Sequence, residues 1–250
     1  MNTAGVTPMN PDLKDAAGAA TRALLNGGPR LALWWWAVLI VSFAATAVTR
    51  GILTTVETST WQWAATAPKI MMLIVGAVLA AGFLPQYVSH GISRRAFSLG
   101  AGVVTAVLAL TGAVIMAAGY GIEAVVYDAV GWRHVIDEPH LFTGPAQWYL
   151  IIPEFTLLFV AWTAVGWVGA TGFYRLVGFN RWDWLLGTLL LIPAALPGVA
   201  AEAFKTWSAQ GRLPLLVGLA GILLASVAGA VAAYHSSKDM PLRGGTGWAV

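Results

Sequence analysis

Apolar residues dominate six stretches of the chain, and short polar segments separate them. The stretches cover residues 31–50, 68–89, 97–121, 150–173, 184–202 and 213–234, and their charges fall mainly at the ends. Each is close to the ~20 residues that a helix needs to cross a hydrocarbon layer of ~30 Å. Because the backbone finds no water in that layer, such segments form helices. The pattern therefore predicts an all-α polytopic membrane protein with six transmembrane helices.

Composition supports this prediction. The chain is 58% hydrophobic and 10% charged, with a mean hydropathy of +0.72, so polar groups cannot cover its apolar surface and lipid must do so. The positive charges lie beside the spans and form no single patch, which argues against nucleic acid as a partner. We expect a cytoplasmic segment at 1–30, a transmembrane domain at 31–234 and a cytoplasmic tail at 235–250.

The basic residues favour a cytoplasmic N-terminus, because inner loops carry an excess of Lys and Arg. This orientation puts nine basic residues inside and five outside. The inner ones are Lys14, Arg22, Arg30, Arg94, Arg95, Arg175, Arg181, Lys238 and Arg243, and the outer ones are Arg50, Lys69, Arg133, Lys205 and Arg212. Six spans return the chain to its starting side. We therefore expect both termini in the cytoplasm and a multi-pass protein in the cell (plasma) membrane.

Two polar segments have alternative interpretations. In residues 1–30, Leu13, Ala17, Ala20 and Leu24 recur at helical spacing, which fits a short interfacial helix or a disordered tail. The long outer connection at 122–149 contains His134, Asp137 and His140, which are metal-ligand types. Their spacing matches no strong signature, so we expect a solvated polar loop and no metal site.

Prolines and small residues suggest where the helices bend and pack. Pro85, Pro193 and Pro197 each remove a backbone hydrogen bond, and Gly198 follows the last of them, so we expect flexible points there. The polar residues after Pro197 suggest that the segment to Leu213 leaves the bundle or re-enters it. Rows of small residues at four-residue spacing in the third and sixth spans fit close helix packing or, alternatively, faces turned to lipid.

Charges inside the spans are scarce, although such charges usually mark ion or proton pathways. Glu154, Glu202 and Lys205 are the candidates for a pathway or outer gate, but their position near outer span ends favours an interfacial role. Trp162 and Trp167 lie inside the fourth span, where they would pack or line a pathway. The sequence has no Gly-Lys dipeptide, so it lacks the loop that holds phosphates in P-loop ATPases, and no hydrolase motif is present.

Two short segments resemble known membrane proteins. The inner connection Tyr87-Val88-Ser89-His90-Gly91-Ile92-Ser93-Arg94-Arg95-Ala96-Phe97 resembles the "Gly-hydrophobe-Ser/Thr-Arg-Arg/Lys-x-Phe" segment of ABC transporter permeases of the type-2 exporter class. The run from Gly166 to Gly178, with Tyr174-Arg175, is similar to the small-residue helix ending in "Tyr-Arg-x-Gly" in these permeases. The six-span layout is similar over residues 30 to 235.

The resemblance implies a permease subunit that a separate ATPase drives. The residues implied to couple the two subunits are Tyr87, His90, Gly91, Ile92, Ser93, Arg94, Arg95 and Phe97. Phe97 would enter a groove of the ATPase, and the two arginines would bond its carboxylates. Alternatively, the arginines only fix the topology and touch lipid phosphates.

We therefore expect the permease subunit of an ATP-driven ABC exporter that moves a hydrophobic or amphipathic substrate. Its partners would be the ATPase, which binds ATP and Mg²⁺, and a second permease subunit, identical or homologous. This chain alone would be no enzyme. A different class remains open, namely a scaffold, immunity or assembly factor that binds another membrane protein through its helices.

The predicted topology can be tested by labelling single cysteines, since the chain has none of its own. A cysteine at Asp137 should react with an impermeant reagent in intact cells. Cysteines at Ser93 and Ser236 should react only after permeabilisation, because the basic residues hold those segments inside. Labelling at Ser93 in intact cells would contradict this topology.

Overall fold

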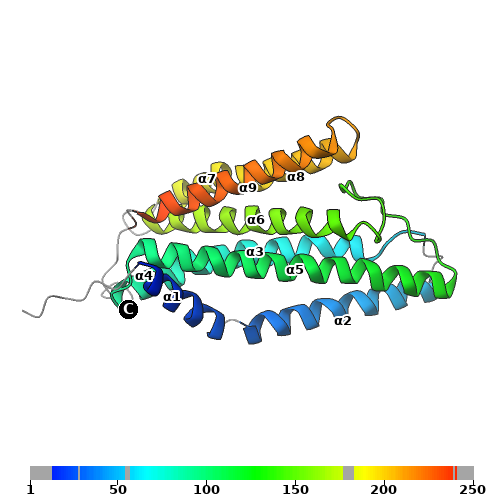
Figure 1. Ribbon diagram of the computed structural model, residues 1–250, viewed down its shortest axis with the longest axis horizontal. Coiled ribbons are helices and arrows are strands. Elements are labelled where there is room, and N and C mark those ends of the chain that lie inside the picture. Colours follow the sequence, from blue (N-terminus) through cyan, green and yellow to red (C-terminus); the bar gives the residue numbers. More distant parts are fainter. Residues whose placement is uncertain (1–12, 28, 54–56, 177–182, 239, 241–250) are drawn as a thin grey trace, which may run out of the picture.

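The computed structural model describes residues 13–27, 29–53, 57–176, 183–238 and 240, and these are mostly helical (Figure 1). In chain order the elements are α1 (Leu13–Gly27), α2 (Pro29–Leu53), the 3₁₀ helix η1 (Trp61–Ala65), α3 (Thr66–Ala77), the π-helix η2 (Val78–Phe83), α4 (Leu84–Ser89), α5 (Arg94–Val130), α6 (Trp148–Leu176), α7 (Asp183–Ala194), α8 (Leu196–Ala209) and α9 (Leu215–Lys238). Within this part of the chain, six helical runs are long and apolar enough to cross a membrane. The predicted all-α polytopic membrane protein is confirmed.

The helices run roughly along the long axis, so the bundle has two ends (Figure 1). The terminal end carries α1, the connection from α4 to α5, and the end of α9. The loop end carries η1, the connection after α5, and the turn between α8 and α9. Helix α6 is central, because it contacts α3, α5, α7, α8 and α9. Helix α2 lies at one side and is buried mainly at Trp36 and Leu39.

Helices α3 and α6 approach so closely that their contact has room only for glycine. A Cβ atom on Gly166 would overlap the backbone carbonyl of Leu73, and one on Gly76 would overlap the carbonyl of Thr163. In lipid, helix association depends on such packing, since no hydrophobic effect drives it. The two glycines therefore set the spacing of α3 and α6.

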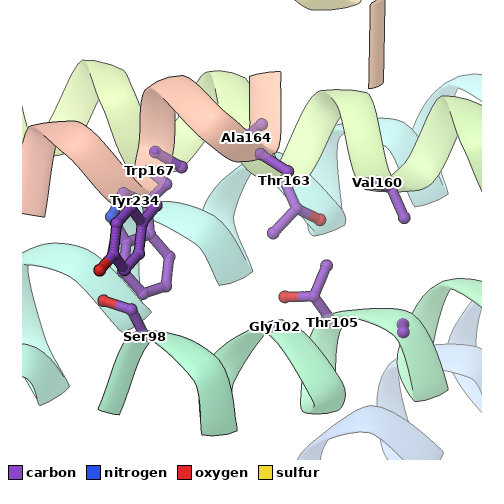
Figure 2. A pocket seen from close by; sticks show the side chains of 11 residues that line it. Ser98, Gly102, Thr105, Val160, Thr163, Ala164, Trp167 and Tyr234 are labelled. Atoms are coloured by element: carbon purple, nitrogen blue, oxygen red, sulfur yellow. The ribbon is translucent and has the colours of Figure 1, made fainter. Parts of the chain in front are cut away.

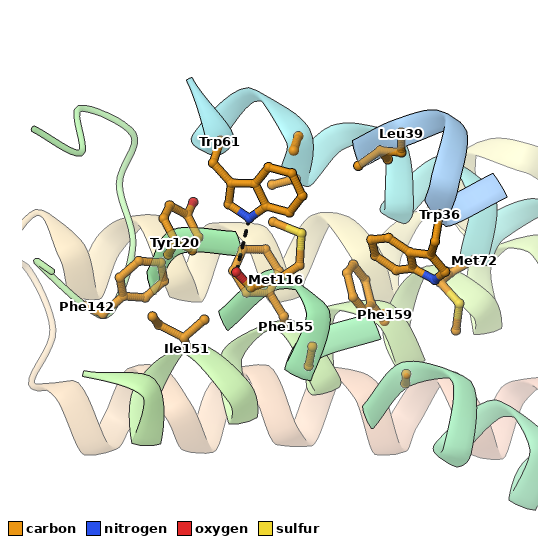
Figure 3. Packing of buried hydrophobic residues seen from close by; sticks show 14 residues of the cluster. Trp36, Leu39, Trp61, Met72, Met116, Tyr120, Phe142, Ile151, Phe155 and Phe159 are labelled. Atoms are coloured by element: carbon orange, nitrogen blue, oxygen red, sulfur yellow. Dashed lines mark hydrogen bonds between the residues drawn. The ribbon is translucent and has the colours of Figure 1, made fainter. Parts of the chain in front are cut away.

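A cluster of large side chains fills the bundle toward the loop end (Figure 3). Trp61 enters it from η1, and its ring nitrogen donates a hydrogen bond of 3.1 Å to the backbone oxygen of Met116. Gly119 leaves room for this ring, because a Cβ there would overlap it. Phe155 and Phe159 of α6 are fully buried beside it. The cluster thus joins the first four spans, with Trp36 and Leu39 entering it from α2.

The structure corrects two predicted helix ends. Helix α5 continues past residue 121 to Val130, because residues 122–130 contain no proline or glycine, and Gly131, with a φ of 76°, ends the helix. The residues after Pro197 do not leave the bundle. They form α8, which continues to Ala209 and packs against α9 and α6. Glu202 of α8 bonds Lys205 of the same helix and Lys69 of α3. These bonds satisfy the polar groups, so the helix remains regular.

The interpretation of 13–27 as a helix is confirmed, and the disordered-tail alternative is wrong there. Helix α1 packs against α5. Ala20 is fully buried there, and a Cβ on Gly100 would lie 2.8 Å from the oxygen of Ala17.

The small residues of the sixth span, α9, also pack against neighbouring helices. A Cβ on Gly229 would lie 2.9 Å from that of Ala164, and one on Gly221 would overlap the ring of Phe204.

The α3–α6 contact predicts a large effect of one methyl group. Gly166→Ala should destabilise the protein by about 1–3 kcal/mol, because the added Cβ forces the helices apart. Gly121→Ala is the control, since a Cβ there meets nothing within 4 Å and alanine favours a helix. Thermal unfolding in detergent measures both. Equal stability of the two variants would contradict the assigned role of Gly166.

Candidate functional site

The connection from α4 to α5 is a tight turn with a defined backbone. We call residues His90, Gly91, Ile92 and Ser93 the inner turn. The amide of Gly91 donates to the oxygen of Val88 at 3.0 Å, and that of Ile92 donates to the oxygen of Tyr87 at 3.1 Å. This pattern ends a helix with a left-handed residue, and Gly91 has a φ of 89°. Glycine adopts this conformation without the steric cost that a Cβ brings.

The inner turn leads directly into α5. The Ser93 hydroxyl oxygen accepts a bond of 3.2 Å from the amide of Ala96, which caps the new helix. His90, Gly91, Ser93 and Arg95 are exposed, and Ile92 is half-buried. The predicted coupling segment is therefore an ordered turn at the terminal end that presents polar groups and one exposed arginine.

Two residues of the predicted coupling set face the chain itself. Phe97 is fully buried, with its ring centre 5.2 Å from that of Tyr87 and 6.1 Å from that of Trp167, so the prediction that it enters a partner's groove is wrong. The first turn of α5 points it inward. Arg94 donates from Nη2 to the backbone oxygen of Met240 at 2.9 Å, so this arginine binds the C-terminal segment of its own chain.

The predicted flexible points coincide with irregular helix geometry. The π-helical turn η2 ends two residues before Pro85, which lies in the first turn of α4. Pro193 and Pro197 lie on either side of the break between α7 and α8 at Ala195. Gly198 is buried, and a Cβ there would lie 3.0 Å from a methyl group of Val165. The prolines thus interrupt the helices, whereas Gly198 serves packing.

The two tryptophans of α6 are packed. Trp167 is buried, and its ring nitrogen donates to the Ser237 hydroxyl at 2.6 Å. Trp162 lies against Gly198, and its ring nitrogen is buried without a hydrogen-bond partner among the described residues. Both rings therefore contact neighbouring helices of the bundle.

A charged group connects α3 and α8 in the loop half of the bundle. Glu202 accepts bonds from Lys69 at 2.7 Å and from Lys205 at 2.8 Å. Glu202 and Lys205 lie three residues apart on α8, a spacing at which side chains on a helix are neighbours. Lys69 joins them from 133 positions away, which the sequence did not indicate. Two lysines on one carboxylate leave a net positive charge.

Glu154 is buried inside the bundle near the start of α6. It lies in the second turn of α6 with no exposed surface, and its two oxygens accept bonds from Nδ1 of His140 at 2.6 Å and from the amide of Leu141 at 2.7 Å. His140 is itself buried and stacks on Phe142 at 4.6 Å between ring centres. The expectation of a solvated loop is therefore wrong at His140 and Leu141, which are buried and bind the Glu154 carboxylate inside the bundle.

Glu123, near the end of α5, also binds backbone amides of another segment. Its carboxylate accepts bonds from the amides of Thr60 and Trp61 at 2.7 and 2.8 Å and from the Ser59 hydroxyl, and Nε2 of His134 lies 3.0 Å from it. The acid thus satisfies free amides at the start of η1. The sequence showed an acid near a span end but could not show its partners at Ser59, Thr60 and Trp61, which are more than sixty residues away.

Among the described residues, no group of three or more His, Cys, Asp or Glu side chains is placed so that it could hold a metal ion. Comparisons with protein-family models, curated proteins and solved structures gave no match. We take the inner turn as the candidate functional site because it is exposed and has a defined backbone. The carboxylates of Glu123 and Glu154 at the loop end bind backbone amides and stabilise the fold.

The bonds of Glu154 predict that its charge stabilises the loop end. In Glu154→Gln the side chain has one acceptor for two donors, so a buried donor loses its partner, at a cost of about 1–3 kcal/mol. Glu138→Gln is the control, because Glu138 lies 3.9 Å from His140 and is partly exposed, and we expect a change within about 0.5 kcal/mol. Thermal unfolding and proteolysis of the loop measure the difference. A Glu154→Gln protein as stable as the control would contradict this role.

Proposed function

We propose that the chain is the permease subunit of an ATP-driven ABC exporter for a hydrophobic or amphipathic substrate, located in the plasma membrane. The fold is a multi-pass helical bundle, and the inner turn is the observation that carries the proposal. It is ordered and largely exposed, two arginines follow it at the start of α5, and it lies at the end of the bundle where positive residues favour the cytoplasm.

The docking surface consists of the exposed residues of the inner turn together with Arg95 in the first turn of α5. His90, Gly91, Ser93 and Arg95 would contact the ATPase, with Arg95 bonding a carboxylate of that partner. Phe97 and Arg94 would act indirectly, because they bond or pack within this chain. Of the residues expected to couple the subunits, we therefore assign direct contact only to the exposed ones.

The turn is well connected to the spans. Arg94 bonds the segment that follows α9, and Phe97 packs on Trp167 of α6. A push on the turn would therefore act on α5, α6 and α9 together. The irregular helix at η2 and the break between α7 and α8 are where the second and fifth spans would bend.

A single six-helix chain encloses little space, so a second permease subunit, identical or homologous, would complete the pathway. Helix α2 suits such pairing, since Trp34, Val38 and Val41 are exposed on a helix with few contacts to the bundle. ATP and Mg²⁺ would bind the partner ATPase. The competing function, a scaffold or assembly factor, needs no ATP turnover.

The proposal predicts that charge reversal at Arg95 abolishes coupling. Arg95→Glu should weaken binding of the ATPase by ~100-fold or more and remove ATP hydrolysis that depends on this chain, because like charges at a docking site cost several kcal/mol. Co-purification and ATP turnover in vesicles are the measurements.

Two variants separate docking from topology. Arg95→Lys keeps the inner positive charge and should bind with reduced affinity, and Gly91→Val distorts the turn without changing charge and should also impair turnover. If correctly oriented Arg95→Glu and Gly91→Val proteins both retain the ATPase and its turnover, the inner turn only fixes topology and the permease proposal fails.

A further inference from the structure

A narrow cleft opens on the side of the bundle between α5, α6 and α9. Its volume is about 160 Å³ (Figure 2). The lining residues are Ser98, Gly102, Thr105, Ala106, Val160, Thr163, Ala164, Trp167, Ala230, Ala233 and Tyr234. Most of these are small or apolar, and the hydroxyl of Thr163 already bonds the backbone oxygen of Phe159. The cleft thus offers an apolar slot with few free polar groups.

The slot lies at membrane depth and is open toward the side. All its residues belong to helices long and apolar enough to span a membrane, so lipid chains surround its opening. Gly102 is exposed, and a Cβ there would meet nothing within 4 Å. The absence of a side chain at this position keeps the slot open without serving any helix contact.

The end of the slot nearest the terminal end is flanked by positive charges. Ser98 and Tyr234 form this end, and Figure 2 shows them facing each other. Arg95 lies three residues before Ser98 on α5, and Lys238 lies four residues after Tyr234 on α9, so each is a neighbour on the same helix face. Both side chains are exposed. Arg95 and Lys238 therefore lie about one helical turn beyond the end of the apolar slot.

We propose that this cleft binds one acyl chain of an anionic phospholipid, whose phosphate lies between Arg95 and Lys238. The charges match an anionic headgroup at the membrane surface, and the slot matches a hydrocarbon chain below it. The hydroxyls of Ser98 and Tyr234 lie between the two and can donate to the glycerol ester or phosphate oxygens. The lipid site does not depend on the proposed transport function, but it shares Arg95 with the proposed docking surface. Its tests therefore change Gly102 and Lys238, which lie outside that surface.

The test uses the full chain, purified and delipidated in a neutral detergent. Phosphatidylglycerol and phosphatidylcholine with the same acyl chains are titrated, and bound lipid is counted by native mass spectrometry together with the thermal shift. We expect one tightly retained phosphatidylglycerol. We expect phosphatidylcholine to bind about tenfold more weakly, because it carries no net charge.

Two variants examine the two parts of the site. Gly102→Leu fills the slot and favours the helix, so it should keep the fold and weaken phosphatidylglycerol binding by about tenfold, whereas Gly121→Leu, at an open position of α5 outside the cleft, should bind normally. Lys238→Glu should weaken binding by on the order of tenfold, and Lys238→Arg should not.

Each part of the proposal can fail separately from folding. If Gly102→Leu, folded as judged by its thermal transition, retains phosphatidylglycerol like the original chain, no acyl chain occupies the cleft and the site is overturned. If phosphatidylcholine binds as tightly as phosphatidylglycerol, or Lys238→Glu has no effect, the headgroup assignment is overturned.

Discussion

The close approach of α3 and α6 is the constraint on which the bundle depends. Lipid gives two apolar helices little reason to associate, so the contact must come from packing, and Gly76 and Gly166 let the backbones touch. Because α6 also contacts α5, α7, α8 and α9, its position determines theirs. The large rings around Trp61 then fill the space that this geometry leaves toward the loop end.

Charged groups hold the two ends of the bundle in opposite ways. At the loop end, Glu123 and Glu154 accept backbone amides and attach η1 and the long connection to α5 and α6. At the terminal end, Arg94 and Arg175 donate to carbonyl oxygens at and just after the end of α9. Acids thus serve free amides and arginines serve free carbonyls, which is the arrangement that the polarity of the backbone favours.

The sequence predicted the spans well because their length and composition are local properties. The apolar pattern stops near residue 121 and therefore missed the last turns of α5, although no proline or glycine occurs in residues 122–130 and Gly131 ends the helix. The bonds of Lys69 to Glu202 and of His140 to Glu154 join separate elements, and no local pattern encodes them. For the same reason the motif around Phe97 did not reveal that this ring faces the core.

The segment from Gly91 to Phe97 therefore contains residues with two different structural roles. Arg94 and Phe97 face the chain's own tail and core, whereas Gly91, Ser93 and Arg95 remain exposed. Resemblance of the whole segment to a permease motif cannot separate these roles, because a family can retain a residue for folding or for docking. Exposure separates the two roles. A substitution at the buried Phe97 alters core packing, whereas one at the exposed Arg95 alters only the surface that a partner could contact. Function at this turn must therefore be assigned from its exposed residues alone.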